Sequence, residues 1–140
     1  MKQKTHLKEE MKEDLMRVYR ALIGEHTFHT QQEAYEATVR HEAPRFYVDA
    51  RWAHQRLSPL MRGDRSGLER MSGLQREMYE ALFEVVMRLS QKEQFWRASL
   101  NYIVRHAVME PAPRFYISAA RMGQIWKERR KRVRKRDEGY

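Results

Sequence analysis

The sequence predicts an all-α protein made of two copies of one three-helix unit, related by a pseudo-twofold axis and followed by a basic C-terminal helix or tail. The five-residue block Ala-Pro-Arg-Phe-Tyr occurs at residues 43–47 and again at residues 112–116. Apolar residues recur at helical spacing before each block. Six glycines and four prolines in 140 residues favour helices over a β-sandwich or barrel.

The sequences flanking the two blocks also match. Val-Arg-His precedes each block, at residues 39–41 and 104–106, and a β-branched residue follows each, Val48 and Ile117. The second copy has four extra residues between these two signatures. A shared block with matching flanks predicts duplication of a supersecondary unit.

Each unit is predicted to contain three helices. Apolar positions at spacings of three and four, such as Leu15, Tyr19 and Leu22, define the first helical face. The segment at 61–73 carries three glycines and two serines, which is typical of a linker. The predicted helices span residues 7–23, 31–41 and 49–58 in the first copy, and 75–90, 93–107 and 118–132 in the second. The predicted organisation is therefore a first unit at 1–60, a linker at 61–73, a second unit at 74–126 and a basic extension at 127–140.

Local chemistry explains the turn between the second and third helices. A proline disfavours the helical state in the residue before it, so the second helices should end near Ala43 and Ala112. Asp49 and Ser118 are good N-caps for the third helices. The Phe-Tyr pair of each block is expected to fill the space between helices. These features predict a structural role for the prolines and the aromatic residues of both blocks.

Arg45 and Arg114 are not explained by proline geometry or by capping, yet both copies carry them. Two interpretations stay open for this pair. The guanidinium can contact a phosphate, or it can brace the turn against a carboxylate or a carbonyl at a helix end.

The net charge is +9 with a pI near 10, which favours polyanions or anionic surfaces as partners. Residues 127–140 hold eight Lys or Arg and three Asp or Glu, a net charge of about +5. The chain has no cysteine, which favours a reducing, cytoplasmic setting. No signal peptide is evident, and the richest apolar stretch, residues 81–87, is far too short to span a bilayer.

Three helices with a capped third helix resemble the trihelical helix-turn-helix modules of DNA-binding proteins. The resemblance implies that the N-terminal half of each third helix reads the major groove. It also implies that paired units lie along one duplex; alternatively, one unit binds nucleic acid and the other binds protein. The turn here is longer than in those modules and lacks glycine, so the helices can cross at another angle. The implied contact residues are Arg51, His54 and Gln55 in the first copy and Arg121 and Gln124 in the second, the alternative being ordinary solvated helix faces.

The C-terminal run is a separate sign of nucleic-acid binding. Clustered cations neutralise phosphates and release counterions without reading sequence. A solubilising solvated end is the alternative, and the run lacks the apolar face that a membrane-surface helix needs. Its candidate phosphate contacts are Lys127, Arg129, Arg130, Lys131, Arg132, Arg134, Lys135 and Arg136.

Catalytic and metal chemistry find little support in the sequence. His26 and His29 lie three residues apart, but no second ligand pair has recognisable spacing. Tyr47 and Tyr116 have no base or metal site nearby that would activate them. No cofactor is therefore predicted. The three tryptophans, Trp52, Trp96 and Trp126, are expected in the core or between the units.

Together these features predict a non-enzymatic nucleic-acid-binding protein with an accessory or regulatory role, DNA being favoured over RNA. Small basic proteins of this design resemble those of phages and mobile elements. The alternative is a structural or adaptor protein of that type, whose tail touches nucleic acid incidentally. A protein partner or a homodimer is compatible with either function.

Overall fold

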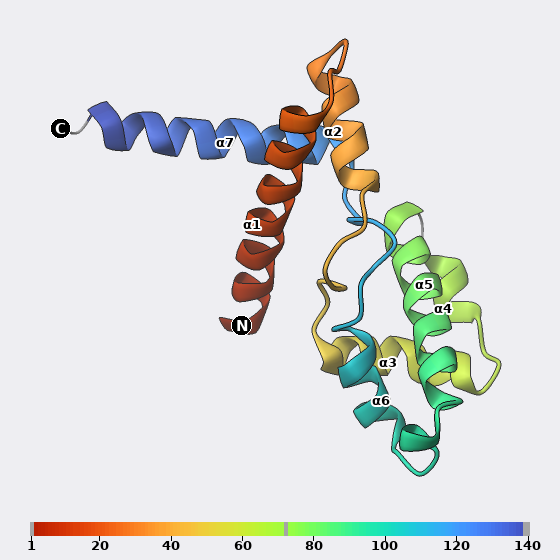
Figure 1. Cartoon of the computed structure of the whole chain (residues 1–140). Helices are drawn as coiled ribbons and strands as arrows, with labels where there is room; N and C mark the ends of the chain where they lie inside the picture. The colour runs from red at the N-terminus through yellow and green to blue at the C-terminus, as the bar shows by residue number, and fades with distance from the viewer. Residues whose placement is uncertain (1, 72, 139–140) are drawn as a thin grey trace.

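The computed structural model describes residues 2–71 and 73–138, with side chains described from residue 6 to residue 132 except at 72. All regular elements in this part of the chain are helices, which confirms the predicted all-α class (Figure 1). They are α1 (Lys2–Glu25), α2 (Gln31–Arg40), α3 (Ala50–Met61), α4 (Ser66–Arg70), α5 (Gly73–Ser90), the 3₁₀ turn η1 (Glu93–Phe95), α6 (Leu100–Ala107) and α7 (Ala119–Glu138).

The third helix of each predicted unit begins at the expected cap. The Asp49 carboxylate accepts a hydrogen bond from the amide of Arg51 at 2.9 Å. The Ser118 hydroxyl accepts one from the amide of Arg121 at 3.0 Å. Each cap satisfies an amide that has no partner inside the helix and contributes about 1 kcal/mol.

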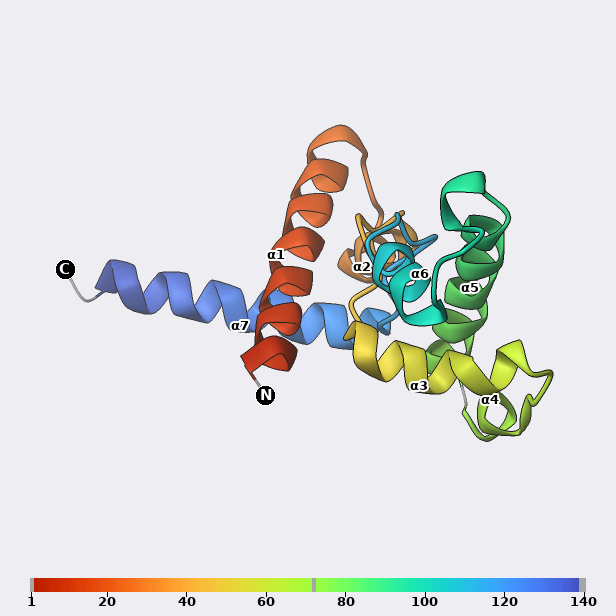
Figure 2. The same ribbon diagram turned by 90° about the horizontal axis from the view of Figure 1, so that it is seen from below.

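The helices pack in two groups, and each group takes its third helix from the other copy of the repeat. α2 packs against α1 and α7, whereas α6 packs against α3 and α5. Figures 1 and 2 show the first group on one side of the molecule and the second group on the other. This arrangement differs from the expectation that the three helices of one unit pack together. The irregular segments at 41–49 and 108–118 are long enough to carry the next helix across.

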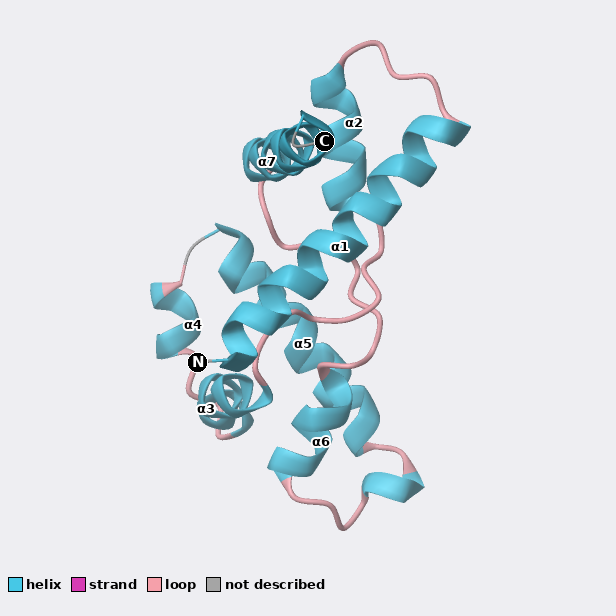
Figure 3. Cartoon of the chain, turned by 90° about the vertical axis from the view of Figure 1, so that its left-hand side faces the viewer, coloured by secondary structure: helices cyan, strands magenta, loops and turns pink. Residues whose placement is uncertain are grey.

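The two extended segments cross between the groups (Figure 3). Ala43 and Ala112 form an isolated antiparallel bridge, with both amide-to-carbonyl distances at 2.9 Å. Beside it, the Phe46 amide donates to the carbonyl of Val108 at 2.9 Å, and the Phe115 amide donates to that of Val39 at 2.9 Å. The crossing therefore provides hydrogen-bond partners for buried backbone amides and carbonyls that have no partner within a helix or a sheet.

Aromatic rings of the two blocks stack across the crossing. Phe46 and Tyr116 lie 6.3 Å apart between ring centroids, and Tyr47 and Phe115 lie 6.0 Å apart. The two phenylalanines are almost fully buried, at 1% and 0% exposed. The structural role predicted for these aromatic residues is confirmed, but their partners come from the other copy of the block.

A close helix contact holds α7 in the first group. The ring of Tyr35 on α2 lies against Gly123 on α7, where a Cβ atom would come within 3.0 Å of Cε2. Tyr19 on α1 stacks with Tyr35 at 5.6 Å and with Trp126 at 4.9 Å between centroids. The absence of a side chain at Gly123 thus lets three aromatic rings fill the space between α1, α2 and α7.

The tryptophans only partly follow the prediction. Trp126 packs between helices as expected, but Trp52 is 46% exposed and Trp96 is 68% exposed. Neither of these two residues is in the core, but Trp52 borders Leu7 of α1 and Tyr79 of α5, a position between the two groups that was the other expectation. The indole N–H of Trp96 donates to the carbonyl of Gln91 at 3.0 Å, which holds the ring at the surface of the turn that includes η1.

The predicted linker is more ordered than the sequence predicts. The predicted linker at 61–73 contains α4, and Leu68 within it is buried. Gly63 has a φ of 83°, a left-handed conformation that glycine adopts without strain and that lets the chain turn after α3. At the other end, α7 runs to Glu138, and its C-terminal part projects away from the helices that pack against its start (Figures 1 and 2). As far as Glu138, the basic extension therefore continues the last helix, which is the helix rather than the tail of the two forms expected.

Candidate nucleic-acid interface

The residues predicted to contact nucleic acid fall into three places. Arg51, His54 and Gln55 line a cleft beside α3. Arg121 and Gln124 lie on the exposed surface of α7, together with the cationic run that follows. The two turn arginines, Arg45 and Arg114, lie next to the crossing, and Arg45 also lines one end of the cleft.

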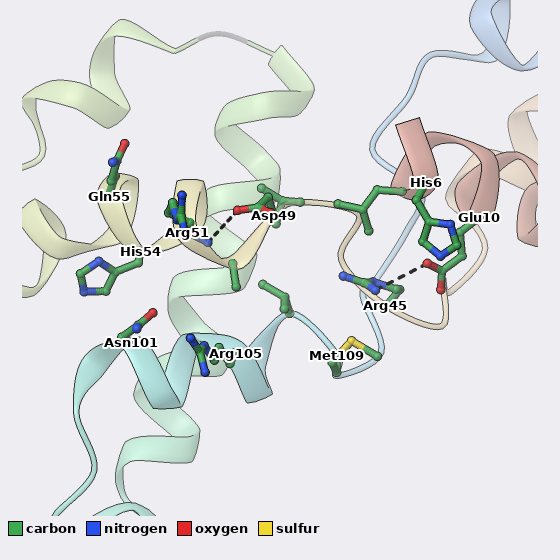
Figure 4. Close-up of a pocket in the computed structure, with 14 residues that line it drawn as sticks. His6, Glu10, Arg45, Asp49, Arg51, His54, Gln55, Asn101, Arg105 and Met109 are labelled. Atoms are coloured by element: carbon green, nitrogen blue, oxygen red, sulfur yellow. Dashed lines mark hydrogen bonds and ion pairs between the residues drawn. The ribbon is translucent and has the colours of Figure 1, made fainter. Parts of the chain in front are cut away.

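The cleft lies between the N-terminal half of α3 and α6, with the start of α1 at one end, and has a volume of about 990 Å³. Figure 4 shows Arg51 and His54 on the α3 side and Asn101 and Arg105 on the α6 side. Val48 and Val108 contribute apolar lining. The polar face of α3 is thus opposed by a second helix, unlike a helix that enters a groove with both flanks free.

The cleft has an excess of positive charge. Its two carboxylates are both engaged, because Glu10 pairs with Arg45 at 3.6 Å and Asp49 caps α3. In contrast, the guanidinium groups of Arg51 and Arg105 make no hydrogen bond or ion pair with any side chain that the structure describes. These two guanidinium groups remain available to an anion.

Sequence reasoning missed Asn101 and Arg105. α6 has an exposed face formed by residues at spacings of one and four, which includes Asn101, Tyr102, Arg105 and His106 and continues to Met109 in the turn after the helix. The helical periodicity of the sequence identifies the exposed face of α6 but not the element that lies opposite that face. Nothing local to α6 indicates that α3, about fifty residues earlier, lies opposite.

The equivalent place in the other group is not a cationic cleft. Aligning the two blocks puts Ala120 where the first copy has Arg51, and Gly123 where it has His54. Gly123 is covered by Tyr35. Aligning the Val-Arg-His signatures likewise puts an acidic residue, Glu36, in the place of Asn101. The side-chain chemistry at this position therefore differs between the two copies of the block.

Arg45 and Arg114 make the same intramolecular contacts. Each Nε donates to the carbonyl of the next residue at 3.1 Å, and each guanidinium lies 5.9 Å from the ring of the tyrosine two residues on. Arg45 also pairs with Glu10, and Arg114 Nη2 donates to Ile117 O at 3.3 Å. The structure thus shows the bracing contacts, one of the two interpretations left open by the sequence.

Tyr47 is held on the α1 side of the crossing. Its hydroxyl donates a hydrogen bond to Asp14, whose other oxygen pairs with Arg17 at 2.8 Å. Burial raises the pKa of Tyr47 far above its ordinary value, and the hydrogen bond to Asp14 raises it further. Burial also raises the pKa of Tyr116. Both hydroxyls are therefore protonated at neutral pH, which suits their packing role.

The second cationic surface lies on α7. Five of the six residues at 127–132 are Lys or Arg. The one acid there, Glu128, lies 3.9 Å from Arg121, which also donates to Gln124 at 3.3 Å. Arg129 pairs with Glu9 of α1 at 3.2 Å, which fixes the rotation of the helix. The remaining exposed cations of this segment are Lys127, Arg130, Lys131 and Arg132, whereas the side chains of Arg134, Lys135 and Arg136 lie outside the described residues.

The cleft and the α7 surface are separate. α3 and α7 belong to different helix groups and lie at opposite ends of the molecule in Figures 1 and 3. This separation favours two independent contact surfaces over two third helices laid side by side. Among the described side chains, no three His, Asp or Glu residues gather as a metal-ligand set. No helix in the described part of the chain has the length and apolar character needed to cross a bilayer.

Comparison with known proteins adds no assignment: no protein family, no curated protein and no solved structure matches this chain.

Proposed function

We propose that this chain is a non-enzymatic nucleic-acid-binding protein whose α7 helix binds the phosphate backbone of duplex DNA. The observation that carries the proposal is the cationic part of α7. Lys127, Arg130 and Lys131 are exposed on a helix that projects away from the rest of the molecule. They lie at spacings of three and four, so they form one stripe. A stripe of unpaired cations neutralises successive phosphates and releases their counterions.

The packing of α7 supports this function because it presents the stripe in a fixed orientation. Tyr35, Gly123 and Trp126 hold the first turns of α7 against α1 and α2, and Arg129 pairs with Glu9. The stripe therefore needs little ordering when it binds, which lowers the entropic cost of association. An unfolded cationic tail of the same composition would lack this advantage.

We also propose that the two helix groups are duplicated units related by a pseudo-twofold axis. The support is the reciprocity of their contacts. Phe46 bonds to Val108 and Phe115 bonds to Val39, and both pairs are related by the same shift of 69 residues that relates the two blocks. After duplication, one unit kept a cationic cleft and the other extended its last helix into the cationic stripe.

The proposal is tested by fluorescence anisotropy of the full chain with a labelled random-sequence duplex across a salt series. In one variant the stripe is neutralised by Lys127→Gln, Arg130→Gln and Lys131→Gln. A matched control neutralises three exposed arginines of the other helix group, by Arg65→Gln, Arg88→Gln and Arg97→Gln. Both variants lose the same net charge.

We expect the stripe variant to lower the slope of log K against log salt by about 2 to 3, and the control by less than about 1. Equal losses in the two variants would mean that net charge alone attracts DNA, and would contradict a defined α7 interface. An unmodified chain that binds no duplex at low salt would contradict nucleic-acid binding altogether.

A second function, that of a protein-interaction adaptor in a phage or mobile element, is favoured by one observation. Trp96, at 68% exposed, and Met87, at 37% exposed, stand at the surface of the α3–α5–α6 group. Exposed aromatic and methionine side chains are enriched where proteins bind one another. Failure of duplex binding in the salt series would favour this adaptor function.

A further inference from the structure

The cleft between α3 and α6 contains binding groups that duplex binding by α7 does not use. Arg51 and Arg105 enter it from the two helices, and neither has an acidic partner among the described side chains. His54 and Asn101 lie between them (Figure 4). An anion in the cleft would meet two guanidinium groups, which bind phosphate through parallel hydrogen bonds.

The exposed face of α6 adds an aromatic surface next to these cations. Tyr102 is 49% exposed, and its ring centroid lies 4.6 Å from that of His106. The buried ring of Phe95 packs against both rings, and its centroid lies 6.0 Å from that of Tyr102 and 5.3 Å from that of His106. Tyr102 directly follows Asn101 of the cleft and comes one helical turn before Arg105. The cation Arg105 therefore lies next to the rings of Tyr102 and His106 on one exposed helix face.

The shape of the cleft selects against a duplex. Its cations stand on two helices that face each other, so a ligand must fit between α3 and α6 to meet both. A volume of about 990 Å³ lies at the upper end of the range of small-ligand sites. Unpaired nucleotides enter such a space and leave their bases free to stack, whereas a duplex holds its bases in its interior.

We propose that the α3–α6 cleft and the exposed face of α6 bind unpaired nucleotides of a single strand, with Arg51 and Arg105 on its phosphates and Tyr102 stacked on a base. His54 and Asn101 contribute polar contacts to the sugar or the base edge. This inference rests on the proposed nucleic-acid-binding function and names a second ligand class at a second surface. At the corresponding place beside α7, the ring of Tyr35 lies against Gly123 and fills the space that the cleft occupies beside α3.

The test measures anisotropy of the full chain with two labelled probes at one low salt concentration. One probe is an oligothymidine of about 12 nucleotides, within the site sizes of single-strand binders. The other is the random-sequence duplex. The variants are Tyr102→Ala, Tyr102→Phe and Arg105→Gln. Arg88→Gln is the charge-matched control, because Arg88 is exposed on α5 and does not line the cleft.

We expect Tyr102→Ala to weaken binding of the oligothymidine about tenfold, while Tyr102→Phe keeps the ring and retains the affinity. Arg105→Gln should weaken it more than Arg88→Gln does. None of the four should change the duplex Kd more than about twofold, because α7 is untouched. The circular dichroism spectrum of each variant establishes that its helices are intact.

Four outcomes would overturn this inference. Tyr102→Ala could leave single-strand affinity unchanged, or it could weaken both probes equally, and in both cases the duplex interface of α7 would stand. A chain that binds the duplex but not the oligothymidine would likewise remove the cleft proposal alone. A chain that binds neither probe would remove this inference and the proposed function together.

Discussion

Ala43 and Ala112 donate their amide hydrogens to each other's carbonyl oxygens, each at 2.9 Å, and so tie the two copies of the repeated block together. The residues stand 69 positions apart and occupy the same place in their blocks. Because each segment passes to the other side at this bridge, the backbone hydrogen bonds and the ring pairs beside it join both copies. The two helix groups should therefore unfold together.

Truncating either buried phenylalanine should test that cooperativity. Phe46→Ala and Phe115→Ala each remove a fully buried ring at the crossing, so each should lower the free energy of unfolding by about 3 to 5 kcal/mol. Urea unfolding followed by circular dichroism should show one transition in both variants. The exposed Trp96→Ala serves as control and should change stability by less than about 0.5 kcal/mol. Two separate transitions would show that the groups unfold independently.

The contact between Gly123 and Tyr35 should not tolerate a branched side chain. Gly123→Val places a Cβ about 3.0 Å from the ring and adds two methyl groups, so we expect a loss of about 1 to 3 kcal/mol by overpacking. Thermal unfolding measures this loss. Gly24→Ala on α1 is the matched control, because no atom lies within 4 Å of the added Cβ. It should be neutral or stabilising by up to about 1 kcal/mol, since alanine favours a helix over glycine. If Gly123→Val raised the unfolding temperature instead, that result would contradict the packing of α7 on α2.

Arg45 and Arg114 should matter more for stability than for binding. Arg45→Ala and Arg114→Ala should each lower the free energy of unfolding by roughly 1 kcal/mol, because partly buried charge-assisted hydrogen bonds are lost. Arg45→Lys should restore little of the lost stability, since an ammonium group lacks the planar arrangement of N–H donors of a guanidinium. Duplex affinity, measured by anisotropy, should change no more than in Arg88→Ala. A larger loss of affinity with unchanged stability would restore the phosphate-contact interpretation.

The buried hydroxyl of Tyr47 should make stability fall at alkaline pH. An unfolded tyrosine ionises near pH 10, whereas burial and Asp14 raise the pKa of Tyr47 far above that value. The folded state therefore keeps a proton that the unfolded state loses, and the free energy of unfolding falls as pH rises above about 10.

Removing that hydroxyl should reduce the alkaline loss. Tyr47→Phe should show a shallower decline between about pH 9 and pH 11 in urea unfolding, and a lower stability at pH 7 because the bond to Asp14 is gone. Tyr116→Phe is the comparison, since burial raises the pKa of Tyr116 but its hydroxyl donates no hydrogen bond to a carboxylate among the described side chains. An identical alkaline decline in Tyr47→Phe and the unmodified chain would show that this hydroxyl is not responsible.

The sequence by itself determined the helical class and much of its local detail. Periodic apolar residues marked the helices, and Asp49 and Ser118 marked the starts of α3 and α7, because periodicity and capping act within a few residues. Burial of Phe46 and Phe115 followed from the same local pattern. Arg51, His54 and Gln55 could be singled out because they lie on the exposed face of a predicted helix.

Only the tertiary structure decided which helices meet. The exchange at Ala43 and Ala112 depends on backbone hydrogen bonds between distant segments, and these leave no local pattern in the sequence. For the same reason, Asn101 and Arg105 could not be assigned to the cleft. The surface position of Trp96 depends on a single hydrogen bond to Gln91, against the apolar preference of its side chain. Local preferences fix each helix, whereas packing between distant residues fixes the partners of each helix and the place where the cleft forms.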